Sequence, residues 1–341
     1  MFNNDSSNER IDLPSEKDLP IKQLLASYSN RKAFFEPLAG NHGDKLIQIG
    51  SLESFKEAKL NLTNDLSKAE VILINGSGSM TPLWGDGFRV LEKYAKSFAN
   101  IPLIVLPSSW DIRNVDIALL LKDHKAPIYL YARELYSFVA LKRINFSSNV
   151  QISLDHDMSF NVLRSSYFKW LLEQKANKHL LIVERRDAES LTYLKEYPLP
   201  LWIKLIKFFA LPIMHKLPSE IYREFKAVVF GFDRLILGAK RRREAIKSDF
   251  VKESVSLIEK THPQFAKLPI YAADISLLSF CSFKQFNLLI AQAAVVVTTR
   301  LHVGILSALL GKPTYIKAGN WHKIRGVYEY SLKDRENVRL I

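Results

Sequence analysis

The stretch Val295-Val296-Val297-Thr298-Thr299-Arg300-Leu301-His302-Val303-Gly304-Ile305 decides the fold of this 341-residue chain. It begins in an apolar run, 294–297, that is typical of a strand covered on both faces. From Leu301 the apolar residues recur at helical spacing, and Gly311 with Pro313 just beyond predicts where this helix ends. A buried strand that turns directly into a helix indicates an α/β fold.

Arg300 and His302 flank the predicted start of this helix. Unpaired backbone N–H groups and the helix dipole already favour an anion at such a place. Because a guanidinium and an imidazole are added there, the turn predicts a site for a charged substrate that also needs a proton.

Short apolar runs alternate with helical segments along most of the chain, which predicts parallel sheets with helices on both faces. The predicted strands are 33–35, 71–75, 103–106, 128–131, 150–154, 180–183 and 294–298. The predicted helices include 44–60, 87–98, 134–144 and 160–173.

This rhythm divides the chain into two α/β blocks. Residues 1–25 are polar and aperiodic, which predicts a disordered tail. We expect an N-terminal Rossmann-like domain over 26–176 and a C-terminal one over 177–341, with an insertion at about 191–250. Two such domains facing a cleft would bind ligands at the carboxyl ends of their strands.

The formal charge is +13 at pH 7, and the lysines and arginines are spread along the chain except for one true cluster, Lys240–Arg243. It follows an apolar and basic stretch, 199–238, that carries too many charges to span a bilayer. One interpretation is that 199–243 lies on an anionic membrane surface. The other is a pair of core helices with a basic solvent face. No stacking motif or helix-turn-helix pattern supports binding of nucleic acid.

Cysteine usage and the N-terminus indicate the compartment. Cys281 is the only cysteine, which excludes an internal disulfide and a cysteine-based zinc site and fits a reducing cytoplasm. The first residues lack the basic-then-apolar pattern of a signal peptide. We therefore expect a cytoplasmic protein.

Polar or small residues follow the first three predicted strands. Asn41 and Asp44 lie at the start of a predicted helix. Either one of them caps this helix, or one of them faces the cleft and contacts a substrate hydroxyl. Gly76 and Gly78 form either a plain tight turn or a concavity whose backbone amides bind an anion. The next strand ends in residues that either form a turn or contact a sugar or phosphate: Ser108, Ser109 and Trp110.

Arg133 ends another predicted strand, where it is either a cationic anchor or a partner of Glu134. Asp155-His156-Asp157 places two carboxylates beside a histidine, an arrangement that can indicate a metal site. No second cluster of ligands accompanies this triplet in the sequence, so we expect no metal.

In their order along the chain, these motifs resemble those of the polysaccharide pyruvyl transferases, over about residues 31 to 330. The most specific piece is Thr299-Arg300-Leu301-His302. The other matching pieces are Gly40–Asp44, Gly76–Gly78, Leu106–Ser109, Ala132–Glu134 with Ser137, Asp157, Arg186–Glu189, Gly311–Pro313, Lys323 and Tyr328.

The resemblance implies two Rossmann-like domains, similar to the GT-B architecture of nucleotide-sugar glycosyltransferases. It also implies transfer of the enolpyruvyl group of phosphoenolpyruvate onto two hydroxyls of a sugar, which forms a cyclic ketal and releases phosphate. Such a reaction needs no cofactor or metal. The acceptor would be a sugar or a lipid-linked oligosaccharide of a polysaccharide precursor, and a lipid-linked acceptor would place the enzyme peripherally at the inner face of a membrane.

Residue roles follow from the same resemblance. Arg300 and His302, with the backbone amide of Leu301, would hold the donor, and Arg133 would be a second anchor. Phosphoenolpyruvate carries a phosphate and a carboxylate, which require at least two cationic or amide anchors. His302 is the candidate acid and Asp44 the candidate base. The other candidates for substrate binding are Asn41, Gly76, Gly78, Ser108, Ser109, Trp110 and Lys323.

Two other functions fit the same sequence. A GT-B-type glycosyltransferase that uses a nucleotide sugar would also need anion anchors at a helix start in its second domain. A non-catalytic basic protein that docks on membranes would use 199–243 instead.

Overall fold

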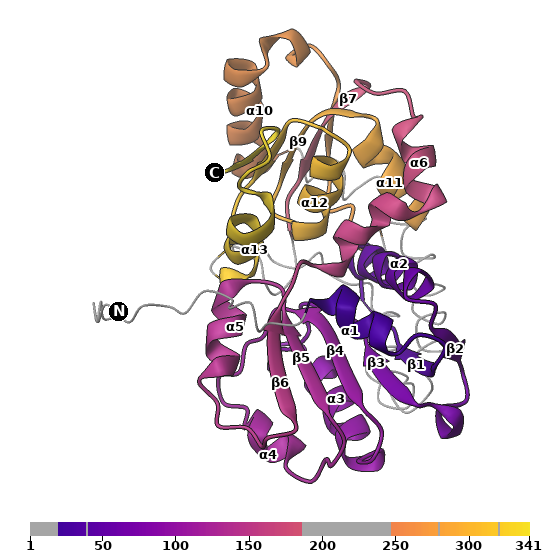
Figure 1. The fold of residues 1–341 in the computed structure, drawn as a ribbon. Coiled ribbons are helices and arrows are strands. Elements are labelled where there is room, and N and C mark those ends of the chain that lie inside the picture. Colours follow the sequence, from indigo (N-terminus) through magenta and orange to yellow (C-terminus); the bar gives the residue numbers. More distant parts are fainter. Residues whose placement is uncertain (1–19, 39, 186–246, 279, 320) are drawn as a thin grey trace, which may run out of the picture.

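The computed structural model describes residues 20–38, 40–185, 247–278, 280–319 and 321–341. Figure 1 shows two halves stacked on each other, each built around a parallel sheet. Helices pack on both faces of each sheet. The predicted α/β fold of two Rossmann-like units is therefore confirmed.

The first sheet has six parallel strands in the order β2-β1-β3-β4-β5-β6. The connections change direction between β1 and β3, and such a switch point is where doubly wound sheets bind ligands. The strands are β1 (Lys32–Glu36), β2 (Asn61–Thr63), β3 (Val71–Ile74), β4 (Leu103–Ser108), β5 (Ile128–Ala132) and β6 (Val150–Leu154).

Alternation along the strands divides the first half into two cores. In β3, Ile72 and Ile74 face one cluster while Val71 and Leu73 face the other, as the period of two requires. The first cluster is covered by α3 (Asp86–Ser97), α4 (Ile117–Leu121) and α5 (Leu135–Lys142). The second is covered by α1 (Ile21–Ser27) and α2 (His42–Glu57).

The second sheet has five strands in the order β11-β10-β9-β7-β8, again all parallel. They are β7 (His179–Val183), β8 (Ile270–Ala272), β9 (Ala293–Thr298), β10 (Thr314–Ile316) and β11 (Val338–Leu340). The helices of this half are α6 (Ser166–Leu172), α10 (Asp249–Thr261), α11 (Phe283–Ala291), α12 (Leu301–Leu309) and α13 (His322–Val327).

Shorter helical turns join these elements. They are η1 (Leu66–Lys68), η2 (Met158–Arg164), η3 (Pro263–Phe265) and η4 (Tyr328–Leu332), of which the last is a π-helical turn. Between β6 and α6, η2 carries the chain from the first half to the second and packs against α2.

All seven predicted strands are present, whereas β2, β8, β10 and β11 were not predicted. These four have only three residues each, too few for a periodic signal. The predicted helix 160–173 is two pieces, η2 and α6, because Ser165 caps α6 through a hydrogen bond from the Phe168 N–H. As predicted, Gly311 follows α12 in a left-handed conformation.

The predicted tail ends too late. Residues 21–25 belong to α1, whose Ile21, Leu24 and Leu25 are buried against the first sheet. The predicted domain boundary after residue 176 separates α6 from the second half, yet Phe168 and Leu171 pack into the core of that half.

Several predictions fall on parts of the chain that the structure does not describe. Residues 1–19 of the tail lie there, as do 186–246, which hold most of the predicted insertion, the Lys240–Arg243 cluster and the Arg186–Glu189 motif. Within the described ranges, no helix has both the length and the apolar character needed to cross a membrane.

The packing of α2 on η2 depends on a glycine. A methyl group at Gly50 would overlap the backbone carbonyl oxygen of Met158. We therefore expect Gly50→Ala to lower the free energy of unfolding by about 1–3 kcal/mol, the usual cost of overpacking. Chemical denaturation measures this change. The control is Gly319→Ala, whose methyl group meets no atom within 4 Å. Equal stability of the two variants would contradict the packing.

Candidate active site

Residues that follow strands of both sheets meet where the two halves touch, and we call this region the seam. The backbone N–H of His42, after β1, donates to the carbonyl oxygen of Ser276, after β8, at 3.0 Å. Nε2 of His42 lies 2.8 Å from the carbonyl oxygen of Cys281. In Figure 1, α13 of the second half lies against α5 of the first.

The start of α2 lies at the seam and is closed by a capping box. The Asn41 side chain accepts a hydrogen bond from the Gly43 N–H at 2.7 Å, and Asp44 Oδ2 accepts one from the Asn41 N–H at 2.7 Å. This motif satisfies N–H groups that a helix start leaves without partners. The predicted cap is confirmed, and both predicted site residues take part in it.

Gly43 allows His302 to approach this helix start. A methyl group at Gly43 would clash with Nδ1 of the His302 ring. The predicted acid on α12 is thereby held one residue away from the predicted base, Asp44. His302 therefore lies against the backbone of the residue next to Asp44, while the Asp44 carboxylate itself accepts the hydrogen bond from the Asn41 N–H.

A chain of buried polar contacts continues from His302 into the first half. Nε2 of His302 lies 3.3 Å from Oδ2 of Asp157, which also accepts a 2.6 Å hydrogen bond from Nη1 of Arg133. Nε of Arg133 donates to Oγ of Ser109 at 2.9 Å. Arg133 and Asp157 are completely buried, and the His302 side chain is 12% exposed.

Asp157 stays ionised in this setting. Burial by itself would raise the pKa of the Asp157 carboxyl, but the charges of His302 and Arg133 lower it well below its usual range. The Ser159 N–H donates to Oδ1 of the same carboxylate at 2.8 Å. The carboxylate thus lies between the Arg133 guanidinium of the first half and the His302 imidazole of the second.

In this series of polar contacts, one guanidinium N–H group of Arg133 has no acceptor among the described residues. Nη2 of Arg133 is buried and makes no hydrogen bond in the described structure. A Cβ at Gly78 would lie 3.2 Å from this atom and 3.2 Å from Nζ of Lys323 on α13. Lys323 is itself buried, with 8% exposed. Two cations from different halves thus lie close to Gly78, which has no side chain, and we call Gly78, Arg133 and Lys323 the anion cradle.

Two further small residues predicted for the site, Gly76 and Ser108, hold the glycine turn in place. The N–H of Ser77 donates to Oγ of Ser108 at 3.1 Å, which ties the glycine turn to the end of β4. A methyl group at Gly76 would clash with the carbonyl oxygen of Pro107. Gly76 and Ser108 are therefore packing residues in this structure, and Gly78 is the glycine that faces the cations.

Arg300 is engaged differently from the prediction. Its Nε donates to Oδ1 of Asp274 at 2.9 Å, and its Nη2 donates to Oδ2 at 2.5 Å. In this bidentate pair the Arg300 side chain is 4% exposed and the Asp274 side chain is 1% exposed. A carboxylate of the protein thus occupies the fork that was predicted to hold the donor. Leu301 opens α12 and buries its side chain against α13.

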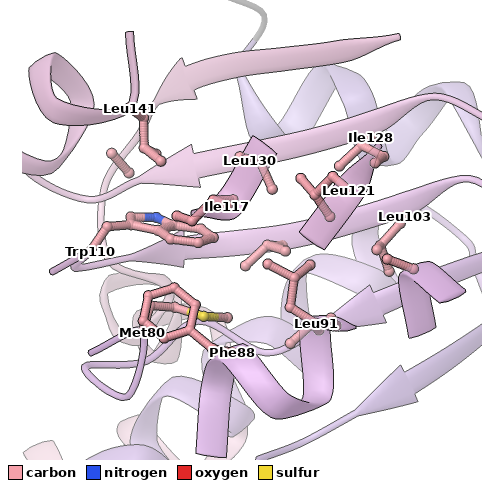
Figure 2. Close-up of a cluster of buried hydrophobic side chains, with 14 of the residues drawn as sticks. Met80, Phe88, Leu91, Leu103, Trp110, Ile117, Leu121, Ile128, Leu130 and Leu141 are labelled. Atoms are coloured by element: carbon pink, nitrogen blue, oxygen red, sulfur yellow. The ribbon is translucent and has the colours of Figure 1, made fainter. Parts of the chain in front are cut away.

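Of the two alternatives for Trp110, the structure favours the structural one over a contact with a sugar or phosphate. Trp110 is 1% exposed, and its Nε1 donates to the carbonyl oxygen of Tyr131 at 3.0 Å. Figure 2 shows its ring packed among Met80, Phe88 and Ile117 in the core of the first half. The indole is large and apolar, so its burial in the core stabilises the fold more than exposure at the seam would.

The Asp155-His156-Asp157 triplet is divided among three roles. Asp155 Oδ2 accepts a hydrogen bond from the Ile21 N–H, and Nδ1 of His156 lies 2.8 Å from Oγ of Ser331. Asp157 joins Arg133 to His302. Among the described residues, no three His, Cys, Asp or Glu side chains are grouped as a metal site.

Asp157 links the site but was absent from the predicted site residues. The resemblance did include it, and its place directly after β6 was the available signal. Gly78 follows β3 and Arg133 follows β5 in the same parallel sheet. Because Asp157 likewise follows β6, it could have been assigned to the same edge of that sheet.

Fold and seam together define a protein of two Rossmann-like domains that carries buried cations where the domains meet. Residues 278–318, which include the Arg-Leu-His turn, match the family model described as polysaccharide pyruvyl transferase. Over that segment the resemblance seen in the sequence is confirmed.

One solved structure with a similar fold is that of a functional uncharacterized protein from Klebsiella pneumoniae subsp. pneumoniae NTUH-K2044. Its TM-score is 0.55 and its sequence identity 18%, and the match covers 94% of this chain and 96% of that chain. At this identity the likeness shows the fold alone. No curated protein matches the chain.

The pairing of Arg300 with Asp274 makes a prediction about stability. Arg300→Met leaves a buried carboxylate without its guanidinium and should lower the free energy of unfolding by about 3–5 kcal/mol. The double variant Arg300→Met/Asp274→Leu should recover most of this loss, because both charges are gone. Guanidinium denaturation measures both. Lys252→Met, which breaks an exposed pair with Asp249, is the control and should cost less than about 1 kcal/mol. If Arg300→Met lowers the free energy of unfolding no more than this control does, the pairing of Arg300 with Asp274 is contradicted.

The lowered pKa of Asp157 makes a prediction about pH. A folded-state pKa below the unfolded value of about 3.9 stabilises the protein fully above that pH and progressively less as the pH falls toward the folded-state pKa. The stability difference between the wild type and Asp157→Asn should therefore be constant above about pH 5 and shrink below about pH 4. Unfolding curves across this range measure it. A difference that grows on acidification would contradict the assigned sign. Exposed Asp334→Asn is the control.

Proposed function

We propose that this chain is a phosphoenolpyruvate-dependent pyruvyl transferase, which moves the enolpyruvyl group onto two hydroxyls of a sugar as a ketal. The observation that carries the proposal is the buried, unpartnered Nη2 of Arg133 beside Nζ of Lys323. A buried donor without an acceptor costs about 1–3 kcal/mol, which a bound anion would offset. The match of residues 278–318 to the pyruvyl transferase family supports this reading.

The donor would bind with its phosphate or carboxylate in the anion cradle. Nη2 of Arg133 and Nζ of Lys323 supply two charge-assisted donors from opposite halves. The second anionic group would lie toward His302 and the first turn of α12, where the Leu301 amide is available to a helix-start anion site. Arg300, paired with Asp274, would position this turn.

The reaction needs one acid and one base. His302 would give a proton to the methylene carbon of phosphoenolpyruvate while the oxygen of a first sugar hydroxyl bonds to the adjacent carbon. Asp44 would accept the proton of that hydroxyl. The bond to phosphate then breaks, the second hydroxyl oxygen closes the ketal, and its proton leaves with the phosphate. Each of the two groups is expected to contribute roughly 10²–10⁴-fold to the rate.

Asp157 would act as a positioning residue for both catalytic steps. Its carboxylate fixes Nε2 of His302 at 3.3 Å and Nη1 of Arg133 at 2.6 Å. The same contact sets the distance between the acid and the anion cradle.

The test is phosphate release from phosphoenolpyruvate, which we expect only when an acceptor sugar is present. Lys323→Met should weaken binding of phosphoenolpyruvate at least tenfold in calorimetry, because one of two buried cations is lost. His302→Gln should lower kcat by roughly 10²–10⁴-fold with binding of phosphoenolpyruvate nearly unchanged.

The control for Lys323→Met is Lys317→Met, which removes a lysine that pairs with exposed Glu253. Tight binding of a nucleotide sugar and none of phosphoenolpyruvate would overturn the proposal in favour of a glycosyltransferase. Full turnover by His302→Gln would remove the role given to that residue.

A further inference from the structure

Three aromatic side chains lead away from the anion cradle. Nζ of Lys323 lies 4.7 Å from the ring centroid of Trp321. The Trp321 ring lies 5.2 Å from that of His322, and the His322 ring stacks on Tyr136 at 5.5 Å with an interplanar angle of 22°. Trp321, His322 and Tyr136 form what we call the seam platform.

Exposure rises along the platform. Lys323 is buried at its inner end, Trp321 and His322 are partly buried, and Tyr136 at its outer end is 46% exposed. The platform therefore runs from the cradle to solvent. A ligand with one end in the cradle region and the rest outside would pass over these rings.

Contacts from both halves hold the platform in place. Tyr136 lies on α5, whereas Trp321 and His322 lie at the start of α13, and Figure 1 shows these two helices at the seam. Nε2 of His322 lies 3.5 Å from Oε1 of Glu134, a fully buried carboxylate that caps α5. A methyl group at Gly326 would press on the Glu134 side chain. The rings are thus fixed on rigid elements.

Core packing does not account for the platform. Nε1 of Trp321 is buried and has no hydrogen-bond acceptor in the described part of the chain. Such an atom needs a partner, and a ligand oxygen would satisfy it. Tyr136 is 46% exposed, so its ring is accessible at the outer end of the platform.

We infer that the seam platform is the acceptor subsite and that it binds a hexopyranose. Aromatic faces with a few placed polar donors are the common lining of small-molecule sites. The apolar C–H face of the sugar ring would lie on Tyr136, and a hydroxyl oxygen would accept a hydrogen bond from Nε1 of Trp321. This places the sugar between solvent and the cradle, with room for a longer glycan beyond Tyr136. That the bound sugar is the acceptor rests on the proposed function, whereas binding of the sugar to the platform does not depend on it.

The kinetic test separates the acceptor from the donor. Tyr136→Ala should raise the KM for a methyl hexopyranoside acceptor at least tenfold, with kcat and the affinity for phosphoenolpyruvate within twofold of the wild type. Tyr136→Phe keeps the ring and should behave as the wild type. Trp321→Phe removes the N–H donor and should raise the same KM about fivefold. Trp170→Phe, on α6 and outside the seam platform, is the control.

A binding measurement makes the outcome independent of turnover. The indole N–H signal of Trp321, identified by its loss in Trp321→Phe, should shift when methyl hexopyranosides are added to the full chain. A shift without phosphate release would leave the sugar subsite standing and overturn the proposed reaction. Turnover with unchanged acceptor KM in Tyr136→Ala and Trp321→Phe, or no shift with a sugar that is turned over, would overturn the subsite.

Discussion

The buried carboxylate of Asp157 is the interaction on which the arrangement of the site depends. It accepts a hydrogen bond from Arg133 of the first half and lies against His302 of the second. A charge removed from water must be paired where it lies, so neither partner can move without large cost. The same interaction therefore joins the two halves and fixes the position of His302.

Glycines allow the halves to come this close. Gly43 receives the ring of His302, Gly78 faces the cations of Arg133 and Lys323, and Gly326 receives Glu134. At each of the three positions a side chain of one half lies where a Cβ of the other would be. Close packing thus brings cationic side chains and aromatic rings from both halves to one seam, which neither half could build alone.

The functional value of each cation depends on how many of its donors the protein itself uses. Arg300 gives Nε and Nη2, one edge of its guanidinium, to Asp274. Arg133 gives Nε to Ser109 and Nη1 to Asp157, and its Nη2 has no acceptor in the described structure. Two arginines at strand ends therefore differ in kind, since the first holds a turn in place and the second still has a donor for a ligand.

The sequence by itself determined seven of the described strands, several helix ends and the sheet edges that meet at the seam. β-Branched runs gave β3 and β9, Asn41 and Gly311 marked the ends of helices, and strand-end position singled out Gly78, Arg133 and His302. These are local signals, because periodicity and capping act within a few residues. Only the tertiary structure decided which side chains meet: it paired Arg300 with Asp274, buried Trp110 in the core, and brought Trp321 and Tyr136 together across the seam. Contacts between residues far apart in the chain depend on how two separate sheets dock, and spacing along the sequence carries no record of that docking.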